Sequence, residues 1–366
     1  MIEYLRSLTL EQKIGQLFFI GVPGPEADDV TRDLLTEIAP GGVCLFTRNI
    51  REASQTRKLL DDIRDILTVE PLLSIDQEGG LVDRLRRVMT PMPAAEAITS
   101  VEDAVEIAAI IAESLRILGF NMDFAPVVDV MGKGRSGQQN GLVSRTFGVT
   151  HEDTVLLAGE FLKVLQSNGI VGCIKHFPGL GASRVDSHEE LPLVDIDENE
   201  WQTTDLYPYR ELLASGEVRS VMVAHAAYPQ LDLQEIGQNG TLLPSSLSYN
   251  FVTSLLRDDL AYDGLVITDD LEMGAIKNNY GMGQACKMAI AAGVDMLAIC
   301  ADAGAIRSGY KAVLEAVRSE EISSVNIDRS LDRIAKVKSQ LSEPVTFEPH
   351  RLEDLSARVH RLSERT

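Results

Sequence analysis

Short apolar runs recur along the whole chain, and segments with helical periodicity separate them. Eight of these runs have the length and composition of buried strands: Leu17–Val22, Gly42–Phe46, Leu72–Ile75, Phe124–Val130, Gly169–Ile174, Ser220–Ala224, Leu265–Thr268 and Asp295–Cys300. Alternating strands and helices give parallel strands joined by crossover helices. Eight such units predict an α/β fold of the (β/α)8 TIM-barrel type rather than an open doubly wound sheet.

The helical segments complete this pattern. Helical periodicity is present in Ala104–Leu118, Thr154–Ser167, Asp205–Ser215, Leu247–Asp258, Ala305–Ser319 and Asp328–Gln340. A length of 366 residues is normal for one α/β barrel, and no Pro/Gly/Ser-rich linker divides the chain. We therefore predict a single domain over residues 1–345, with a charged tail over residues 346–366 that packs on the barrel or trails from it.

The net charge of −21 limits the classes of partner. It argues against nucleic acid, which is bound through broad basic surfaces, and against an anionic membrane face. The four cysteines form no CxxC pair and no His/Cys cluster, so we expect buried, reduced thiols. The N-terminus has no apolar signal segment, and no run of about 18 uncharged apolar residues is present. These features predict a cytoplasmic protein.

Polar residues follow most of the predicted strands, at the ends where barrel enzymes place their chemistry. These positions are Thr47–Asn49, Asp76–Gly80 with Asp83 and Arg84, Asp129, Ser144–Phe147, Lys175–His176 with the loop up to His188, His225, and Asp269–Asp270. Because the carboxyl ends of parallel strands meet on one rim of a barrel, we expect a single site there.

Asp269 and Asp270 end the apolar run Leu265–Thr268. Neighbouring residues of a strand point to opposite sides, so the two carboxylates should have different roles. One is suited to cap the next helix, a position that favours Asp. The other is suited to the barrel mouth, as a nucleophile or as a stabiliser of an oxocarbenium-like transition state.

Asp186 and His188 lie in a loop that also contains Gly179 and Gly181. An aspartate within reach of a histidine orients the imidazole and raises its basicity, which makes a general acid/base pair. The alternative is a solvated pair of loop residues. The glycines favour a mobile loop that could bring the pair over a bound substrate.

Lys175, His176, Asp76 and Arg84 are suited to bind a polar ligand. Carboxylates accept hydrogen bonds and arginines donate them, so Asp76 and Arg84 match sugar hydroxyl groups; a surface salt bridge is the alternative. Lys175 could instead form a Schiff base, as strand-end lysines of aldolases do. Scattered histidines without H-E-x-x-H predict no metal, and the G-x-G at Gly179 lacks the dinucleotide-binding context. We expect no cofactor.

Longer motifs resemble a known family from about Leu8 to Leu341. They read SIDQEGGLVDRLR from Ser74, SRTFG from Ser144, KHFPGLGASRVDSHEELP from Lys175 and GLVITDDLEMGAI from Gly264, with LTLEQKIGQLF, GGVCLFTRNI, FNMDFAPVVDV and SVMVAHAAYP elsewhere. The chain resembles glycoside hydrolase family 3, specifically its bacterial single-domain β-N-acetylglucosaminidases of peptidoglycan recycling. The KHFPG-x-G string followed by D-x-H is highly specific.

The resemblance implies a role for each matched residue. Asp269 corresponds to the nucleophile that forms a covalent glycosyl-enzyme, His188 to the general acid/base, and Asp186 to the partner that orients His188. The pocket for the terminal N-acetylglucosamine corresponds to Asp76, Arg84, Arg145, Lys175 and His176. The resemblance thus implies a retaining exo-β-N-acetylglucosaminidase, monomeric and active on muropeptide-like carbohydrates.

Two residues depart from the family pattern: Leu180 stands where a histidine is usual and Leu81 where an arginine is frequent. They lead us to expect an altered rate, loop mobility or leaving-group preference, with a catalytically weak sugar-binding protein as an alternative. A phosphorylase is a second alternative, because a histidine acid/base repels phosphate less than a carboxylate does. A β-glucosidase of the family is a third. The multi-domain β-glucosidases take the acid/base from another domain that this sequence does not contain, so N-acetylhexosaminidase is preferred.

Overall fold

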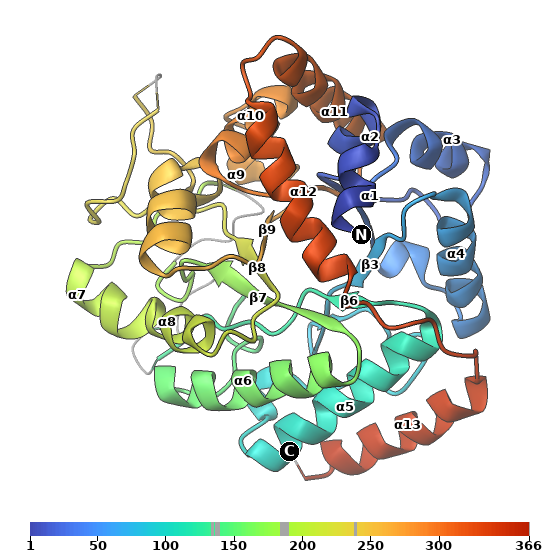
Figure 1. Ribbon diagram of the computed structural model, residues 1–366. Coiled ribbons are helices and arrows are strands. Elements are labelled where there is room, and N and C mark those ends of the chain that lie inside the picture. The colour runs from blue at the N-terminus through green and yellow to red at the C-terminus, as the bar shows by residue number, and fades with distance from the viewer. Residues whose placement is uncertain (133–134, 136–139, 184–189, 238–239, 366) are drawn as a thin grey trace.

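The computed structural model describes residues 1–132, 135, 140–183, 190–237 and 240–365. Within these residues the chain forms a barrel of parallel strands surrounded by helices (Figure 1). Eight strands form one sheet in the order β10, β1, β2, β3, β6, β7, β8, β9. Their bounds are β1 (Phe18–Gly21), β2 (Gly42–Leu45), β3 (Leu72–Ile75), β6 (Met122–Asp123), β7 (Val171–Phe177), β8 (Ser220–Val223), β9 (Leu265–Thr268) and β10 (Leu297–Ile299). The predicted (β/α)8 barrel is confirmed.

The barrel closes where its last strands meet its first. β1 pairs with β10, with Phe18 opposite Leu297. A bridge from Ile267 to Met296 joins β9 to the chain that enters β10, and the Thr268 N–H donates to the Met296 carbonyl at 3.1 Å. The strand residues are buried almost throughout, because side chains fill the barrel interior and helices cover its outside.

Helices follow most of the strands and form the outer layer. The longer ones are α3 (Asp29–Ile38), α4 (Ala53–Ile66), α5 (Val101–Leu118), α6 (His151–Ser167), α8 (Tyr207–Ala214), α10 (Met282–Ala292), α11 (Ala303–Arg318), α12 (Ser324–Lys338) and α13 (Pro349–Ser363). Shorter ones are α1 (Ile2–Ser7), α2 (Leu10–Gly15), α7 (Glu198–Glu200) and α9 (Gly274–Lys277), with 3-10 turns at Thr47–Asn49, Ala95–Ala97 and Ser245–Leu247 and π-helical segments at Trp201–Asp205 and Asn250–Asp259. No helix in the described ranges is long and apolar enough to cross a membrane.

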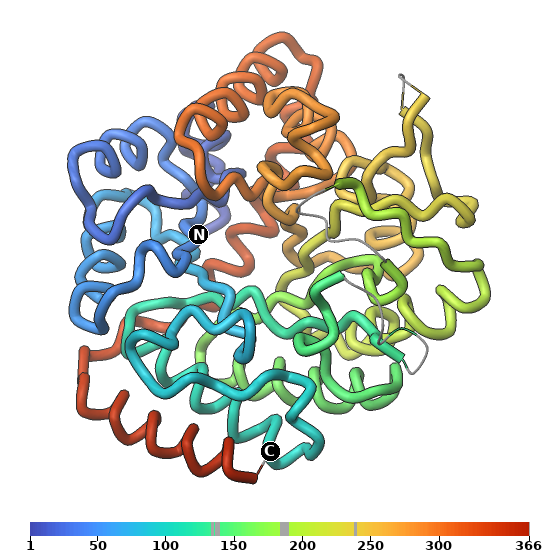
Figure 2. The backbone as a smooth tube through the Cα atoms, turned by 180° about the vertical axis from the view of Figure 1, so that it is seen from behind, coloured from blue at the N-terminus to red at the C-terminus, as the bar shows by residue number. Residues whose placement is uncertain are grey.

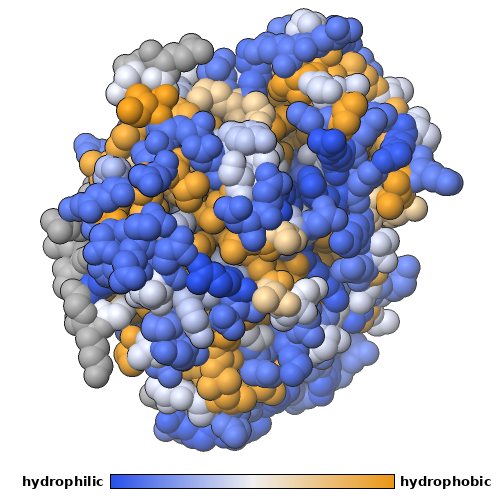
Figure 3. Space-filling view, turned by 60° about the vertical axis from the view of Figure 1, so that its left-hand side comes forward, coloured by the Kyte–Doolittle hydropathy of each residue, from blue (hydrophilic) through white to orange (hydrophobic). Residues whose placement is uncertain are grey.

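The local sequence explains where the helices begin and end. Ser100 caps α5 by accepting the Asp103 N–H, and Gly119 ends this helix with a φ of 101°, a conformation that favours glycine. Thr150 and Asp153 form a capping box at the start of α6. The apolar stripes of surface helices face inward, and the face seen in Figure 3 is accordingly largely hydrophilic with small apolar groups between.

The fourth strand lies earlier in the chain than the sequence predicts. The prediction was Phe124–Val130, but β6 covers Met122–Asp123, and Val127 makes a separate bridge to Lys175. Pro126 explains the difference, because proline has no N–H to donate to a strand ladder. The chain between β6 and this bridge is therefore irregular.

Two predicted helices also differ in detail from the structure. The segment predicted at Asp205–Ser215 is divided into the π-helical Trp201–Asp205 and α8, whose first turn contains a proline. The helix predicted at Leu247–Asp258 covers Asn250–Asp259 and is π-helical. Neither difference moves a strand, so the predicted alternation of strands and helices is unaffected.

The C-terminal helix α13 packs against α5, as two opposite views show (Figures 1 and 2). Its buried residues Leu352, Leu355, Val359 and Leu362 recur at helical spacing. The predicted charged tail thus contains an amphipathic helix seated on the barrel's outer layer. The boundary between barrel and tail at residue 345 stays a prediction.

Candidate active site

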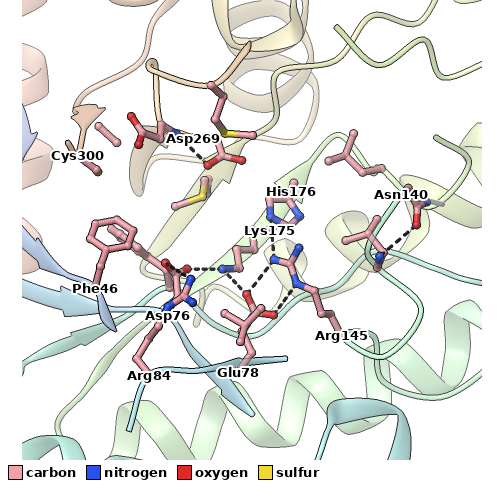
Figure 4. A pocket seen from close by; sticks show the side chains of 18 of the residues that line it. Phe46, Asp76, Glu78, Arg84, Asn140, Arg145, Lys175, His176, Asp269 and Cys300 are labelled. Atoms are coloured by element: carbon pink, nitrogen blue, oxygen red, sulfur yellow. Dashed lines mark hydrogen bonds and ion pairs between the residues drawn. The ribbon is translucent and has the colours of Figure 1, made fainter. Parts of the chain in front are cut away.

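A pocket lies at the carboxyl ends of the barrel strands, and its cavity measures about 170 Å³. Six residues predicted from the sequence line it together (Figure 4): Asp76, Arg84, Arg145, Lys175, His176 and Asp269. They come from the ends of β3, β7 and β9 and from the loops that follow β3 and β6. Residues far apart in the sequence therefore meet at one rim, as the barrel topology requires.

The floor of the pocket is a cluster of ion pairs centred on Lys175. Its Nζ lies 2.7 Å from Asp76 Oδ1 and 2.6 Å from Glu78 Oε1. Glu78 also accepts hydrogen bonds from Arg145 Nε at 2.8 Å and Nη2 at 2.9 Å. Arg84 Nη2 lies 4.0 Å from Asp76 Oδ2, and Arg84 Nε is buried without a hydrogen-bond partner among the described residues. Such preset donors and acceptors suit a ligand rich in hydroxyl groups.

Burial and ion pairing act in opposite directions on this cluster. Burial raises the pKa of Glu78, but Arg145 and Lys175 outweigh burial and lower that pKa well below its usual value. Burial lowers the pKa of Lys175, but Asp76 and Glu78 outweigh burial and raise it above its usual value. Lys175 is therefore firmly protonated. This state conflicts with the Schiff-base alternative, because an amine nucleophile must be neutral.

The imidazole of His176 lies between a carboxylate and a guanidinium group. Its Nδ1 lies 2.7 Å from Oδ2 of the fully buried Asp129, and its Nε2 lies 3.5 Å from Arg145 Nη2. Consecutive residues of a regular strand point to opposite sides, yet Lys175 and His176 both line the pocket. The register of β7 against β8 shifts at this point, so the strand is not regular here.

Asp269 faces His176 across the pocket (Figure 4). Burial raises the pKa of Asp269, but His176, His225 and the Asp270 N–H, which donates to Asp269 Oδ1 at 2.8 Å, outweigh burial and lower it. Asp270 differs, because burial raises its pKa to about 7. The Asp270 carboxylate accepts the Glu272 N–H at 3.0 Å, as aspartates in turns and caps do. Asp269 is thus the carboxylate that is ionised at neutral pH, as a nucleophile must be.

The predicted pair Asp186 and His188 lies outside the described residues, so its role and its position relative to Asp269 stay predictions. The chain that leads to it is described up to residue 183, where Leu180 and Ser183 line the pocket. The start of this loop therefore borders the site that contains Asp269.

Both departures from the family pattern lie near the pocket. Leu180 lines it and is 6% exposed. Leu81 is 70% exposed, between strands β4 (Gln77–Gly79) and β5 (Val82–Asp83) of a small hairpin. A Cβ at Gly181 would lie 2.0 Å from the Val130 carbonyl oxygen, so glycine is required beside Leu180.

Sequence reasoning missed two residues that hold the pocket together, Glu78 and Asp129. A signal for Glu78 existed: it follows Asp76 by two residues in an extended segment, which places both on the same side. Asp129 had no such signal, because its contact with His176 depends on the irregular path of the chain around Pro126. Both residues were noted at strand ends, but without a role.

The structure also describes the other residues that the sequence analysis considered at the rim or as metal ligands. His225 is fully buried, with Nδ1 2.7 Å from Ser246 Oγ and Nε2 3.1 Å from the Asp270 carbonyl oxygen, and burial lowers its pKa. All four cysteines are buried and unpaired, as predicted. The described residues contain no group of three or more His, Cys, Asp or Glu side chains placed to hold a metal ion.

Known proteins match the chain over most of its length. Residues 9–337 match the glycosyl hydrolase family 3 N terminal domain. A β-hexosaminidase of Psychromonas ingrahamii is 31% identical over 338 residues, which cover 90% of this chain and 94% of that protein. A β-hexosaminidase of Pseudomonas aeruginosa is 34% identical over 276 residues, covering 74% and 78%. The solved structure of a family 3 β-N-acetylglucosaminidase from Paenibacillus sp. str. FPU-7 aligns with a TM-score of 0.87 and 37% identity, covering 98% of this chain and 69% of that one. The chain therefore belongs to glycosyl hydrolase family 3.

Proposed function

We propose that this protein is a retaining exo-β-N-acetylglucosaminidase, which hydrolyses terminal non-reducing β-N-acetylglucosamine through a covalent glycosyl-enzyme. The substrates named for its β-hexosaminidase and β-N-acetylglucosaminidase relatives support this sugar. The observation that carries the proposal is the geometry of the pocket. A partly buried, ionised Asp269 faces a fixed cluster of hydroxyl-binding groups around Lys175.

The size and chemistry of the pocket favour one sugar unit. Its volume of about 170 Å³ is below the ~300 Å³ at which ordinary ligand pockets begin. Lys175, Arg84 and Arg145 offer N–H donors, and Asp76 and His176 offer acceptors. A pocket that holds a single ring supports action at a chain end.

In the proposed reaction Asp269 attacks the anomeric carbon while His188, oriented by Asp186, protonates the leaving oxygen. The C–O bond to the leaving group breaks and a bond to Asp269 forms. His188 then removes a proton from water, which attacks the same carbon and releases Asp269. Two inversions give net retention of the β-configuration. A histidine acid/base differs from the usual pair of carboxylates in retaining glycosidases.

The proposed biological setting follows from the resemblance to the family. Resemblance to enzymes of peptidoglycan recycling supports muropeptide-like substrates, a role in the cytoplasm and a monomer. Release of N-acetylglucosamine from purified muropeptide disaccharides, measured by mass spectrometry, tests the substrate. Sedimentation velocity tests the monomer, and a concentration-dependent dimer would contradict it.

The reaction class is tested with p-nitrophenyl glycosides. We expect rapid release from the β-N-acetylglucosaminide and at most slow release from the β-glucoside, with no acceleration by phosphate. Acceleration by phosphate with sugar 1-phosphate as product would show the phosphorylase instead. A preference for the glucoside would show a β-glucosidase, and tight sugar binding without turnover a catalytically weak protein.

The nucleophile is tested by Asp269→Ala. We expect kcat to fall by about 10⁴-fold or more, because loss of a nucleophile removes the covalent route. The matched control is Asp232→Ala at an exposed loop position, which should behave as wild type. A mechanism-based fluoroglycoside followed by proteolysis should place the label on the peptide with Asp269. Labelling of a different carboxylate, or an active Asp269→Ala, would refute the assignment.

A further inference from the structure

Asp129 has no role in the reaction proposed above, yet it is fully buried beside the pocket. Its Oδ2 lies 2.7 Å from His176 Nδ1 and accepts the His176 backbone N–H at 3.3 Å. Its Oδ1 accepts the backbone N–H of Leu180 at 2.7 Å. One carboxylate therefore contacts both a sugar-pocket histidine and the start of the loop that carries Asp186 and His188.

The contacts of His176 define its tautomer. A carboxylate is an acceptor only, so the ring nitrogen that faces Asp129 carries the proton. The other nitrogen, Nε2, lies 3.5 Å from Arg145 Nη2, and arginine is always a cationic donor. The neutral imidazole is therefore the Nδ1–H tautomer, with a bare Nε2 that accepts a hydrogen bond from a ligand hydroxyl group.

The hydrogen bond from Leu180 to Asp129 lies in a segment whose backbone is also held by other hydrogen bonds. The Gly179 N–H donates to the His176 carbonyl at 2.8 Å, and the Tyr228 hydroxyl donates to the Gly179 carbonyl at 2.9 Å. Leu180 itself lines the pocket. The backbone between His176 and Leu180 is thus held from both sides, and Asp129 bonds to its two ends.

We propose that Asp129 is a positioning residue whose two oxygens hold His176 as the Nδ1–H tautomer and fix the loop at Leu180, so that sugar binding and acid/base catalysis share one anchor. The catalytic half of this inference rests on the proposed function; the tautomer of His176 does not.

Asp129→Asn separates these roles with little change in shape. An amide has one acceptor oxygen, whereas Asp129 supplies an acceptor to both His176 and Leu180. The variant must therefore lose one contact. If the amide oxygen keeps Leu180, its NH₂ faces His176 and imposes the Nε2–H tautomer. We expect kcat/KM for the p-nitrophenyl N-acetylglucosaminide to fall by about 10²-fold, as small misplacements at a site do.

Separate measurement of kcat and KM distinguishes a positioning role from a merely structural one. Loss of the His176 contact should raise KM, and loss of the Leu180 contact should lower kcat most for glycosides whose poor leaving groups need the acid. A 2,4-dinitrophenyl leaving group needs little protonation, so its kcat should fall least. Equal losses for both leaving groups would remove the link to acid catalysis, and wild-type kinetics would remove the whole inference.

The tautomer is measured directly by long-range ¹H–¹⁵N NMR on the full-length protein labelled at histidine. The chain has six histidines, and His176→Gln identifies the signal by its loss. Wild type should show His176 as Nδ1–H, and Asp129→Asn should lose that pattern. An Nε2–H tautomer in wild type would overturn the inference even if the variant failed to fold. If the glycosides are not turned over, this measurement still decides the Asp129–His176 contact.

The matched control is Asp295→Asn. Asp295 is equally buried but lies at the opposite end of the barrel, where it binds Arg257 at 2.6 Å and Arg333 at 3.2 Å. This variant should lower Tm while leaving the His176 tautomer and the kinetics of the folded enzyme unchanged. A change in either readout would show that loss of any buried carboxylate produces the effect.

Discussion

At the scale of single residues, Glu78 is the anion that permits two cations to lie side by side. Lys175 and Arg145 both contact its carboxylate, and the exposed fraction of its side chain is 3%. Arg145 contacts no other carboxylate among the described residues at ion-pair distance. The geometry of the sugar-binding floor therefore depends on a residue that need not touch the sugar.

Glu78→Gln should lower both stability and activity. Removing one partner of a buried ion pair typically costs ~3–5 kcal/mol, because the other charge stays buried. We expect the free energy of unfolding in urea to fall by an amount of this order, and kcat/KM to fall by about 10²-fold as Lys175 and Arg145 move apart. Glu217→Gln, at an exposed position, is the control. Wild-type kcat/KM in Glu78→Gln would contradict the positioning role.

Asp270 predicts a pH dependence of stability. Burial raises its folded-state pKa to about 7, so between about pH 4 and 7 the folded state binds more protons than the unfolded state. Stability should therefore fall as pH rises through this range, by up to ~1.4 kcal/mol per pH unit from this one group. Asp270→Asn should remove that contribution. Urea unfolding of both proteins at several pH values measures it; parallel curves would contradict the prediction.

The sequence alone identified the residues of the pocket that carry charge at strand ends, such as Asp76, Lys175 and Asp269. Strand topology explains this success, because a barrel brings all such ends to one rim. The sequence could not show that Asp269 and Asp270 differ in protonation, because that difference depends on burial and on nearby N–H groups. Asp186 and His188, named from the sequence, stay predictions.

At the scale of elements, helix α13 covers the outer face of α5 through a narrow apolar stripe. Leu355 is fully buried in this contact, and Leu352 and Val359 flank it at helical spacing. The helix lies far from the pocket in sequence and contributes no lining residue to it. Its effect should therefore be on stability alone.

Leu355→Ala should destabilise the protein by about 2–5 kcal/mol, the usual cost of a buried Leu→Ala change. The kcat/KM of the folded enzyme should not change. Thermal unfolding and kinetics well below Tm test both statements, with exposed Glu353→Ala as the control. A large loss of kcat/KM at low temperature would show that α13 acts on the active site.

The elements also show where sequence patterns fail. Seven predicted strands lie where expected because each is a short apolar run buried on both sides. The run Phe124–Val130 is equally apolar, but Pro126 interrupts its ladder and β6 forms before it. The apolar composition thus located the core, whereas the missing N–H of Pro126 determined the bounds of the fourth strand.

At the scale of the whole molecule, Lys338 connects the C-terminal part of the barrel sequence to its N-terminal part. It is 3% exposed at the end of α12, and its Nζ donates to Gln16 Oε1 at 2.8 Å. Gln16, after α2, in turn donates to the Ala39 carbonyl at 2.9 Å. Burial lowers the pKa of Lys338 to about 7.

Lys338 predicts the opposite pH dependence to Asp270. Between about pH 7 and 10 the unfolded state binds more protons than the folded state, so stability should rise with pH by up to ~1.4 kcal/mol per unit from this group. Lys338→Met should remove that rise and be more stable than wild type at pH 7. Paired urea titrations at pH 7 and 9 measure the difference. A less stable Lys338→Met at pH 7 would show that the Gln16 bond outweighs the cost of burial.

Closure of the barrel by β10 against β1 has a consequence for folding. These strands lie far apart along the chain, and Phe18 cannot meet Leu297 until the whole segment between them has been synthesised. Contacts of such high sequence separation form slowly. Until β10 docks, β1 and β9 each present an unpaired edge open to pairing with other chains. Ala298 and Cys300 also line the pocket, so protection from aggregation and a complete active site arise in the same closing step.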